Sequence, residues 1–157
     1  MTNSHDQHSR HTGDPRLLEI EQELRRGNYL RDDDRPLERI LGEDAEIVSR
    51  LHMDLDEITS KMKRFYDLGR EGLGEPVVTD DDFEITVRED RGIIPSPWGD
   101  NYGAPKAIID VTNLRNGKKL RFSMLGWHLI RSHGFFQGKG SPFRIDPREL
   151  HDFFEQA

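Results

Sequence analysis

The sequence contains no cysteine, and this absence excludes several kinds of structure and chemistry at once. Without thiols there is no disulfide framework, no thiolate zinc site and no cysteine nucleophile. No apolar run approaches the roughly 20 residues that a membrane-spanning helix needs. The N-terminal stretch MTNSHDQHSRHTGD also lacks the hydrophobic region of a signal peptide. We therefore expect a cytoplasmic protein that makes no contact with a membrane.

Apolar and aromatic residues are scarce as well. Hydrophobic residues make up 33% of the 157 positions, aromatic residues 8% and charged residues 34%. A single domain of this length buries roughly 70% of its unfolded surface, so one core is sufficient, but part of the chain should lie outside it. We assign residues 1–13 to a disordered polar tail and residues 14–157 to a single domain. His5, His8 and His11 recur every third residue in this tail, and we interpret them as tail residues rather than as a metal site.

The net charge of −7 is distributed unevenly along the chain. Residues 14–100 contain 13 basic and 24 acidic side chains, whereas residues 101–148 contain nine basic and two acidic ones. A basic segment of this kind suits a polyanionic partner. The alternative is that the two halves neutralise each other within a monomer or a dimer.

Residues 14–75 are predicted to form the helical part of the domain. An Asp-Pro pair is typical of a helix start, and Gly27 is placed to end this first helix. From about Glu43 to Leu68, apolar residues recur at spacings of three and four, which predicts one long helix with a continuous apolar seam. The seam residues are Val48, Leu51, Leu55, Ile58, Met62 and Phe65.

The seam also predicts how the helices assemble. The first helix offers only Leu17, Ile20 and Leu24 to cover it, about half the length that the seam requires. We therefore expect either a helical hairpin, in which the first helix folds back on the long one, or self-association of two copies. In the homodimer, the acidic flank of the helix would meet the basic hairpin of the second subunit.

Residues 76–157 predict a small antiparallel sheet followed by two short helices. The expected strands, which alternate between apolar and polar residues, are Phe83–Arg88, Ala107–Thr112 and Lys118–Ser123. Asn116-Gly117 indicates the turn of a β-hairpin. Gly134 is placed to end the first of the two C-terminal helices, and Asp146-Pro147 to start the second. The predicted fold class is α+β, with an N-terminal helical hairpin or long helix, a small antiparallel sheet with a β-hairpin, and two short C-terminal helices.

The densest group of aromatic, histidine and basic residues lies between Leu120 and Pro147. Within it, the segment Gly134–Ser141 departs from the phosphate-binding loop pattern, because one spacer residue is missing and a glycine separates Lys139 from the serine. We therefore exclude a nucleoside triphosphatase. A looser anion site, made by the glycine-rich turn with Lys139 and Arg144, remains an alternative. No catalytic triad, nucleophile elbow or pair of carboxylates is evident, so the sequence favours a non-catalytic role.

Two histidines and two aromatic residues are the remaining candidates for chemistry or binding. His128 and His133 are five residues apart, so on one helix their side chains diverge by about 140° and can share a ligand only if one lies past the helix end. We therefore predict no metal and no cofactor. Trp98 and Tyr102 lie in a loop of turn-forming residues, where they either bind a partner or fold back on the core.

The leading hypothesis is a non-catalytic binding or adaptor protein whose basic, aromatic surface contacts a protein partner or a second copy of the chain. A nucleic-acid-binding protein is the first alternative, in which the basic side chains contact phosphates and the aromatic ones stack on bases. A histidine-based, metal-dependent hydrolase that uses His128 and His133 is the second. The predicted binding residues are Lys118, Lys119, Arg121, Trp127, His128, Arg131, His133, Phe135, Phe136, Lys139 and Arg144.

Overall fold

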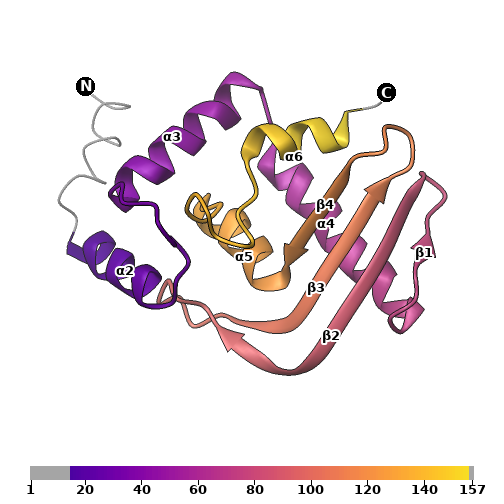
Figure 1. Cartoon of the computed structure of the whole chain (residues 1–157), viewed down its shortest axis with the longest axis horizontal. Helices are drawn as coiled ribbons and strands as arrows, with labels where there is room; N and C mark the ends of the chain where they lie inside the picture. The colour runs from indigo at the N-terminus through magenta and orange to yellow at the C-terminus, as the bar shows by residue number, and fades with distance from the viewer. Residues whose placement is uncertain (1–14, 156–157) are drawn as a thin grey trace.

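Four antiparallel strands in the order β1-β2-β3-β4 form one sheet in the computed structural model, which describes residues 15–155 (Figure 1). The strands are β1 (Val77–Val78), β2 (Phe83–Pro95), β3 (Gly103–Asn113) and β4 (Lys119–Ser123). The helices are α2 (Pro15–Arg26), α3 (Leu37–Arg50), α4 (Leu55–Gly69), the short 3-10 helix η1 (Arg70–Gly72), α5 (Met124–His133) and α6 (Pro147–Phe154). The predicted α+β class is confirmed. None of the helices in residues 15–155 combines the length and the apolar character that crossing a membrane requires.

Some expectations fall on residues that the structure does not describe. These are the tail assigned to residues 1–13, its three histidines and the helix-capping role of Asp14. The helix that we expected to follow is α2, which ends one residue before Gly27.

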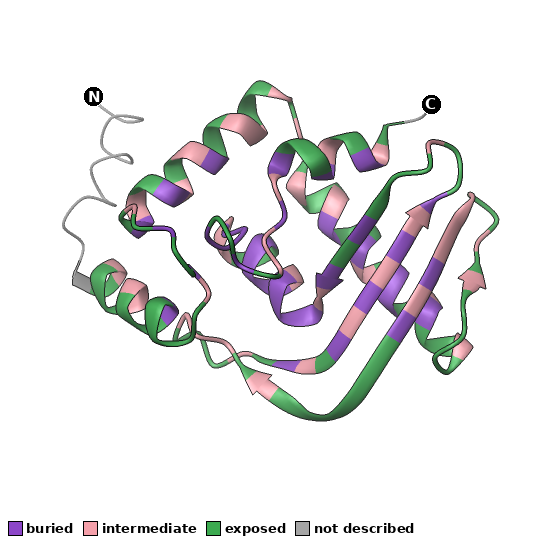
Figure 2. Ribbon diagram, in the orientation of Figure 1, coloured by how far each residue is buried: buried purple, intermediate pink, exposed green. Residues whose placement is uncertain are grey.

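The sheet buries one face and leaves the other partly open, as Figure 2 shows by the alternating burial along its strands. The inward-facing residues, each 7% exposed or less, are Ile85, Val87, Ile109, Val111, Leu120 and Phe122. This face contacts α4 and α5. The predicted alternation in the strand Lys118–Ser123 is therefore correct, because Leu120 and Phe122 point into the core while Lys119 and Arg121 are exposed.

The single long helix predicted from about Glu43 to Leu68 is wrong, because the chain turns between α3 and α4. His52 has a left-handed backbone with φ of 54°, which a right-handed helix cannot accommodate. The N–H of Met53 bonds to the carbonyl of Val48, and that of His52 to the carbonyl of Ser49, which is the hydrogen-bond pattern of a Schellman helix end. A new helix then begins at once, because the Asp54 carboxylate accepts a hydrogen bond from the Glu57 N–H at 3.1 Å.

The break changes the argument for a homodimer. Met62 and Phe65 of the predicted seam are buried in the core of the same chain. Val48, Leu55 and Ile58 are half-buried and pack against that core. The long helix with an uncovered apolar seam, which was the reason to expect a homodimer, therefore does not exist in this structure. The homodimer remains a prediction, but the seam no longer supports it.

The β3–β4 hairpin holds the last helix in place. Its loop is closed by a hydrogen bond from Asn113 N–H to the Lys118 carbonyl, and Gly117 has φ of 76°. The side chain of Asn113 donates a 2.8 Å hydrogen bond to the carbonyl of Phe153, and that of Asn116 donates to the same carbonyl at 3.3 Å. The turn residue that the sequence indicated thus also binds the C-terminal end of α6.

The C-terminal end of β2 and the N-terminal end of β3, which pair with each other, bend away from the rest of the sheet and run toward α2 (Figure 1). The pairing of the two strands shifts between Asp90 and Ile93, and Gly92 has φ of 109° at this bulge. A bulge of this kind bends a strand and increases its twist. Strand β4 pairs only with residues 108–112 of β3, so residues 103–107 have no β4 neighbour. This uncovered stretch of β3 borders the candidate site.

Candidate functional site

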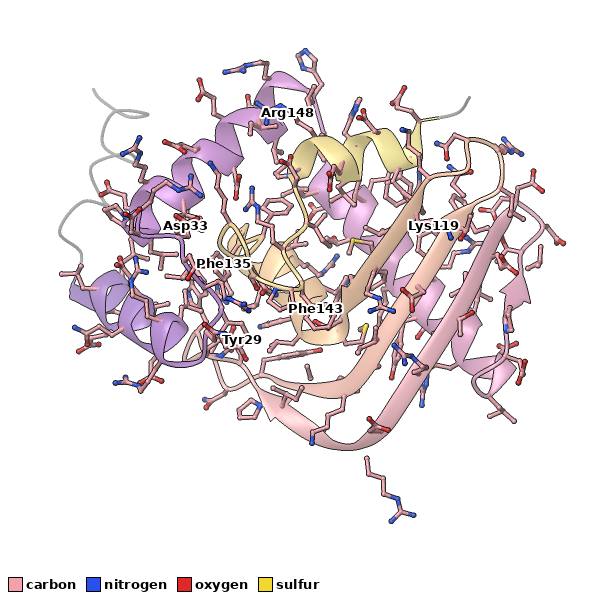
Figure 3. All side chains as sticks on the ribbon, in the orientation of Figure 1. Tyr29, Asp33, Lys119, Phe135, Phe143 and Arg148 are labelled. Carbon is pink, nitrogen blue, oxygen red and sulfur yellow. The ribbon has the colours of Figure 1, made fainter. Side chains whose placement is uncertain are left out.

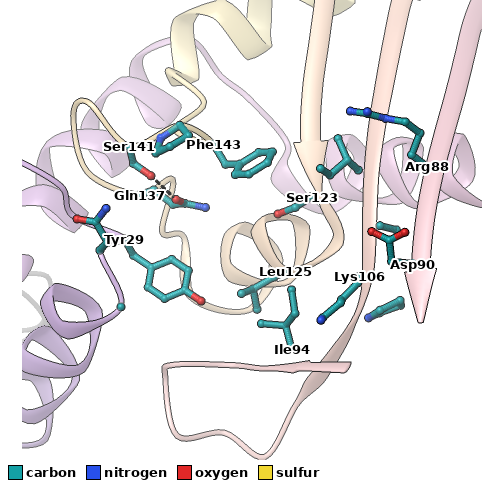
Figure 4. A pocket seen from close by; sticks show the side chains of 16 residues that line it. Tyr29, Arg88, Asp90, Ile94, Lys106, Ser123, Leu125, Gln137, Ser141 and Phe143 are labelled. Carbon is teal, nitrogen blue, oxygen red and sulfur yellow. Dashed lines mark hydrogen bonds between the residues drawn. The ribbon is translucent and has the colours of Figure 1, made fainter. Parts of the chain in front are cut away.

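A cavity of about 540 Å³ lies where β4 ends, between the bent strands and two loops (Figure 4). Its walls come from residues 27–29 after α2, from β2 and β3, from the start of α5 and from the 137–143 loop. The volume falls within the range of about 300–1,000 Å³ that is usual for small-ligand sites. The early end of β4 leaves this space without a strand, and the bulge bends β2 and β3 beside it.

The cavity walls are mainly apolar, with polar groups at a few points. Ile94, Ile108 and Leu125 contribute aliphatic surface, and Figure 4 shows the hydroxyl group of Tyr29 directed toward the interior. Gln137 lies on the same side of the cavity as Tyr29, and its side-chain carbonyl accepts a 2.6 Å hydrogen bond from the Ser141 hydroxyl group, which fixes the orientation of the amide. Such a surface suits a ligand with an apolar body and few polar groups.

Three charged residues of the open sheet face also border the cavity: Arg88 and Asp90 from β2, and Lys106 from β3. All three are exposed, and Asp90 and Lys106 are direct neighbours across the two strands. Their side chains form no hydrogen bond or ion pair with another described residue. They are therefore free to contact a ligand that enters from this side.

The far wall of the cavity, which lies away from the sheet, is formed by the loop after α2 and by the 137–143 loop, and hydrogen bonds join these two loops. The N–H of Gly138 donates to the Tyr29 carbonyl at 3.0 Å, and the N–H of Lys139 donates to Asp33 Oδ2 at the same distance. A Cβ atom at Gly138 would lie 2.5 Å from the Leu30 carbonyl oxygen, so this close approach requires glycine. The hydrogen bond from Arg35 to Asp33 holds the pKa of this carboxyl group well below its usual range.

The predicted binding residues do not form one continuous surface. Phe135 and Phe136 are core residues, 0% and 2% exposed, because the chain after α5 turns inward. Arg144 is largely buried and forms an ion pair with Asp44 at 2.8 Å. Figure 3 shows Lys119 on the sheet, well away from Phe135 in the interior.

The other predicted residues lie in separate places. Lys118, Lys119 and Arg121 are exposed on the β3–β4 hairpin, where Arg121 forms an ion pair with Asp110 at 2.7 Å. Lys139 is exposed on the cavity loop. Trp127 and Arg131 instead point to α4, where Trp127 Nε1 donates to the Thr59 carbonyl at 2.8 Å and Arg131 Nη1 to the Thr59 hydroxyl group at 3.1 Å.

The structure brings His128 and His133 together, and it places Asp100 of the β2–β3 loop between them. Nε2 of His128 lies 2.7 Å from Asp100 Oδ2, and Nε2 of His133 lies 2.6 Å from the same oxygen. His133 is the last residue of α5, before Gly134 with φ of 62°, so both histidines lie within the helix and the expectation that they can share a ligand only if one lies past its end is wrong. They reach the same oxygen because the carboxylate comes from a separate loop and lies between the two side chains. Asp100 was not among the predicted residues, because it is 28 residues from His128 and belongs to a different element.

Two aromatic rings hold the histidines in this arrangement. Tyr102 stacks on His128 with ring centroids 3.8 Å apart, and Trp98 stacks on His133 at 4.3 Å. The sequence left open whether these aromatic residues bind a partner or fold back on the core. In the structure, both rings fold back and pack on α5 of the same chain. Trp98 also contributes to a second cavity of about 430 Å³ between the loop and α2.

The electrostatics of the Asp100 carboxyl group follow from these contacts. Burial alone would raise its pKa, but the hydrogen bonds from His133 and His128 outweigh that effect and hold the pKa well below its usual range. The other oxygen, Oδ1, accepts a 3.2 Å hydrogen bond from the Tyr102 N–H. Asp100 is therefore an ionised carboxylate with imidazole nitrogens on one side.

Comparison with known proteins finds no match to a protein-family model, a curated protein or a solved structure.

Proposed function

We propose that this chain is a non-catalytic binding protein and that its ligand occupies the cavity between the sheet and the 137–143 loop. The observation that carries the proposal is the preformed cavity of about 540 Å³, with its apolar walls and few polar groups. The proposal keeps the class of function expected from the sequence, but it moves the site from the basic surface to the cavity.

The expected ligand is a small amphipathic molecule. Its apolar body would contact Ile94, Ile108 and Leu125, and burial of such surface contributes roughly 25 cal/mol per Å². A polar group would reach Tyr29 or Gln137 on the far wall. A charged group would remain near Arg88, Asp90 and Lys106 at the open side, where water still screens it.

A fluorescent probe tests the proposal without knowledge of the natural ligand. The dye 8-anilinonaphthalene-1-sulfonate has an apolar ring system and one negative charge, and we expect it to bind the folded protein saturably with one equivalent. Ile108→Phe fills part of the cavity and should weaken binding by about tenfold or more, a loss of roughly 1.4 kcal/mol. Thr112→Phe is the matched control, because Thr112 lies on the same strand face but outside the cavity.

The charge of the rim provides a second readout with the same dye. Lys106→Ala should weaken binding of this anion, and Asp90→Ala should strengthen it, since the two side chains are cross-strand neighbours of opposite charge. Equal dye affinity in wild type, Ile108→Phe and Thr112→Phe would place the dye elsewhere and overturn the proposal. Near-ultraviolet circular dichroism of each variant confirms that the core remains packed.

A further inference from the structure

We infer that Asp100, His128 and His133 form a binding site for a divalent transition-metal ion. Each residue offers one ligand atom, and these atoms all lie within 4.8 Å of one another. Imidazole nitrogen and carboxylate oxygen are the ligands that zinc and related ions use in proteins without cysteine. The inference concerns a different part of the molecule from the cavity and does not depend on a ligand there.

The distances between the ligand atoms show which movements would open the group for an ion. The two Nε2 atoms lie 2.7 and 2.6 Å from Asp100 Oδ2. Ligand atoms on a tetrahedral zinc ion, at about 2.0–2.1 Å from the metal, are roughly 3.3 Å apart. To bind an ion, the Asp100 carboxylate would move about 0.6 Å away from each nitrogen, and the two histidine nitrogens, which lie within 4.8 Å of each other, would take the same separation of roughly 3.3 Å. Asp100 is in a loop, so a small change of its side-chain torsions is sufficient for its part of this movement.

The surroundings of the three residues favour coordination through these particular atoms. Ser132 Oγ lies 3.3 Å from Nδ1 of His128, on the side of the ring opposite Asp100. With an ion on Nε2, the proton of the neutral imidazole moves to Nδ1, where the hydroxyl oxygen can accept its hydrogen bond and so serve as the outer partner that orients a metal-bound histidine. The stacked rings of Tyr102 and Trp98 hold both imidazole planes in place before an ion binds.

The group is accessible from solvent without being fully exposed. The side chains of His128, His133 and Asp100 are 10%, 19% and 23% exposed. Three protein ligands leave at least one position of a zinc ion for water or for another molecule. Because Asp100 belongs to the β2–β3 loop and both histidines to α5, the ion would also fasten this loop to the helix.

The experiment begins from a background variant that lacks the three tail histidines, His5→Ala with His8→Ala and His11→Ala, because these side chains can bind metal on their own. We expect this variant to bind one equivalent of Zn²⁺ in isothermal titration calorimetry. We also expect Co²⁺ to produce the intense visible absorption of a four-coordinate site. The cobalt spectrum reports on the ligands themselves and does not depend on any activity.

The discriminating substitution is His133→Gln in this background. Glutamine still donates a hydrogen bond to Asp100, but it replaces the imidazole ligand, so Zn²⁺ affinity should fall by about 100-fold and the cobalt absorption should disappear. His151→Gln is the matched control, since His151 also lies near carboxylates, Asp152 at 3.3 Å and Glu155 at 3.5 Å, and should leave both signals unchanged. Failure of the background variant to bind Zn²⁺, or equal affinity in His133→Gln, would overturn the inference and leave the three residues as a hydrogen-bonded fastening of the loop.

Discussion

Arg144 and Asp44 are 100 residues apart in the sequence and form a buried ion pair between α3 and the segment that joins α5 to α6. The guanidinium group donates two hydrogen bonds to the carboxylate, at 2.8 and 3.0 Å, and the two side chains are only 12% and 4% exposed. Arg144 also donates to the Gln137 carbonyl at 2.8 Å. Through this ion pair, the basic segment 101–148 and the acidic segment 14–100 neutralise each other within one molecule.

Breaking this pair from one side should be costly. Asp44→Asn leaves the Arg144 charge buried without its counter-ion, and we expect a loss of about 3–5 kcal/mol in the free energy of unfolding, measured by urea denaturation. Glu23→Gln is the control, because Glu23 pairs with Arg26 on the exposed face of α2 and should contribute less than about 1 kcal/mol. The double variant Asp44→Leu with Arg144→Met should recover much of the loss. A cost for Asp44→Asn as small as that of the control would contradict the pair's importance.

The turn between α3 and α4 predicts an unusual response to glycine. His52 has φ of 54°, so His52→Gly should stabilise the protein by about 0.5–1 kcal/mol, because glycine adopts this conformation without strain. In a continuous helix, the same substitution would instead cost about 0.5–1 kcal/mol. Ala45→Gly, at an exposed position inside α3, is the control and should show that cost. Thermal and urea unfolding of the two variants give opposite signs only if the helix is interrupted at His52.

Gly138 should be the least replaceable glycine of the cavity loop. In Gly138→Ala the new methyl group would lie 2.5 Å from the Leu30 carbonyl oxygen, so the two loops must separate, at a cost of about 1–3 kcal/mol. Dye binding in the cavity should weaken in parallel, because these loops form its far wall. Gly42→Ala is the control: apart from its two neighbours and the backbone of its own helix, no atom lies within 4 Å of the new methyl group, and alanine favours the helix by about 1 kcal/mol. Equal stability of the two variants would show that the loops around Gly138 and Leu30 tolerate a methyl group between them.

The lowered pKa of Asp33 predicts a stability that depends on acid. A carboxyl group with a lower pKa in the folded state stabilises the protein above its unfolded pKa of about 3.9, and this contribution is lost as the pH falls from there toward the folded value. The difference in unfolding free energy between wild type and Asp33→Asn should therefore be constant from about pH 7 to pH 5 and shrink below about pH 4. Asp32→Asn, at the exposed neighbouring position, should cost little at any of these pH values. A difference for Asp33→Asn that persists unchanged at about pH 2 would refute the linkage.

Much of the local structure was determined by the sequence itself. Gly134 ends α5 in the left-handed conformation, and Asp146 begins α6 by accepting a 2.8 Å hydrogen bond from the Arg148 N–H. The alternation of Leu120 and Phe122 with basic residues identified the buried face of β4. These features depend on neighbours within four residues along the chain, and such short-range preferences can be read directly from residue types.

The spacing of apolar residues did not predict the break between α3 and α4 at His52. The apolar residues keep a three-four spacing on both sides of the turn, and no glycine marks the left-handed position. The signal that remained was Asp54 three residues before Glu57, which is typical of a helix start. A hydrophobic pattern records which residues are buried, and two short helices packed on one core can satisfy the same pattern as one long helix.

Only the tertiary structure decided which distant side chains meet. Asp100 joins His128 and His133 because the bent β2–β3 hairpin carries its loop to the end of α5. The cavity exists because β4 stops at Ser123 while β3 continues past it. The ion pair between Asp44 and Arg144 likewise depends on how α3 packs beside the segment that joins α5 to α6. Contacts across 28 or 100 residues depend on the path of the whole backbone, and the local preferences of single residues do not specify that path.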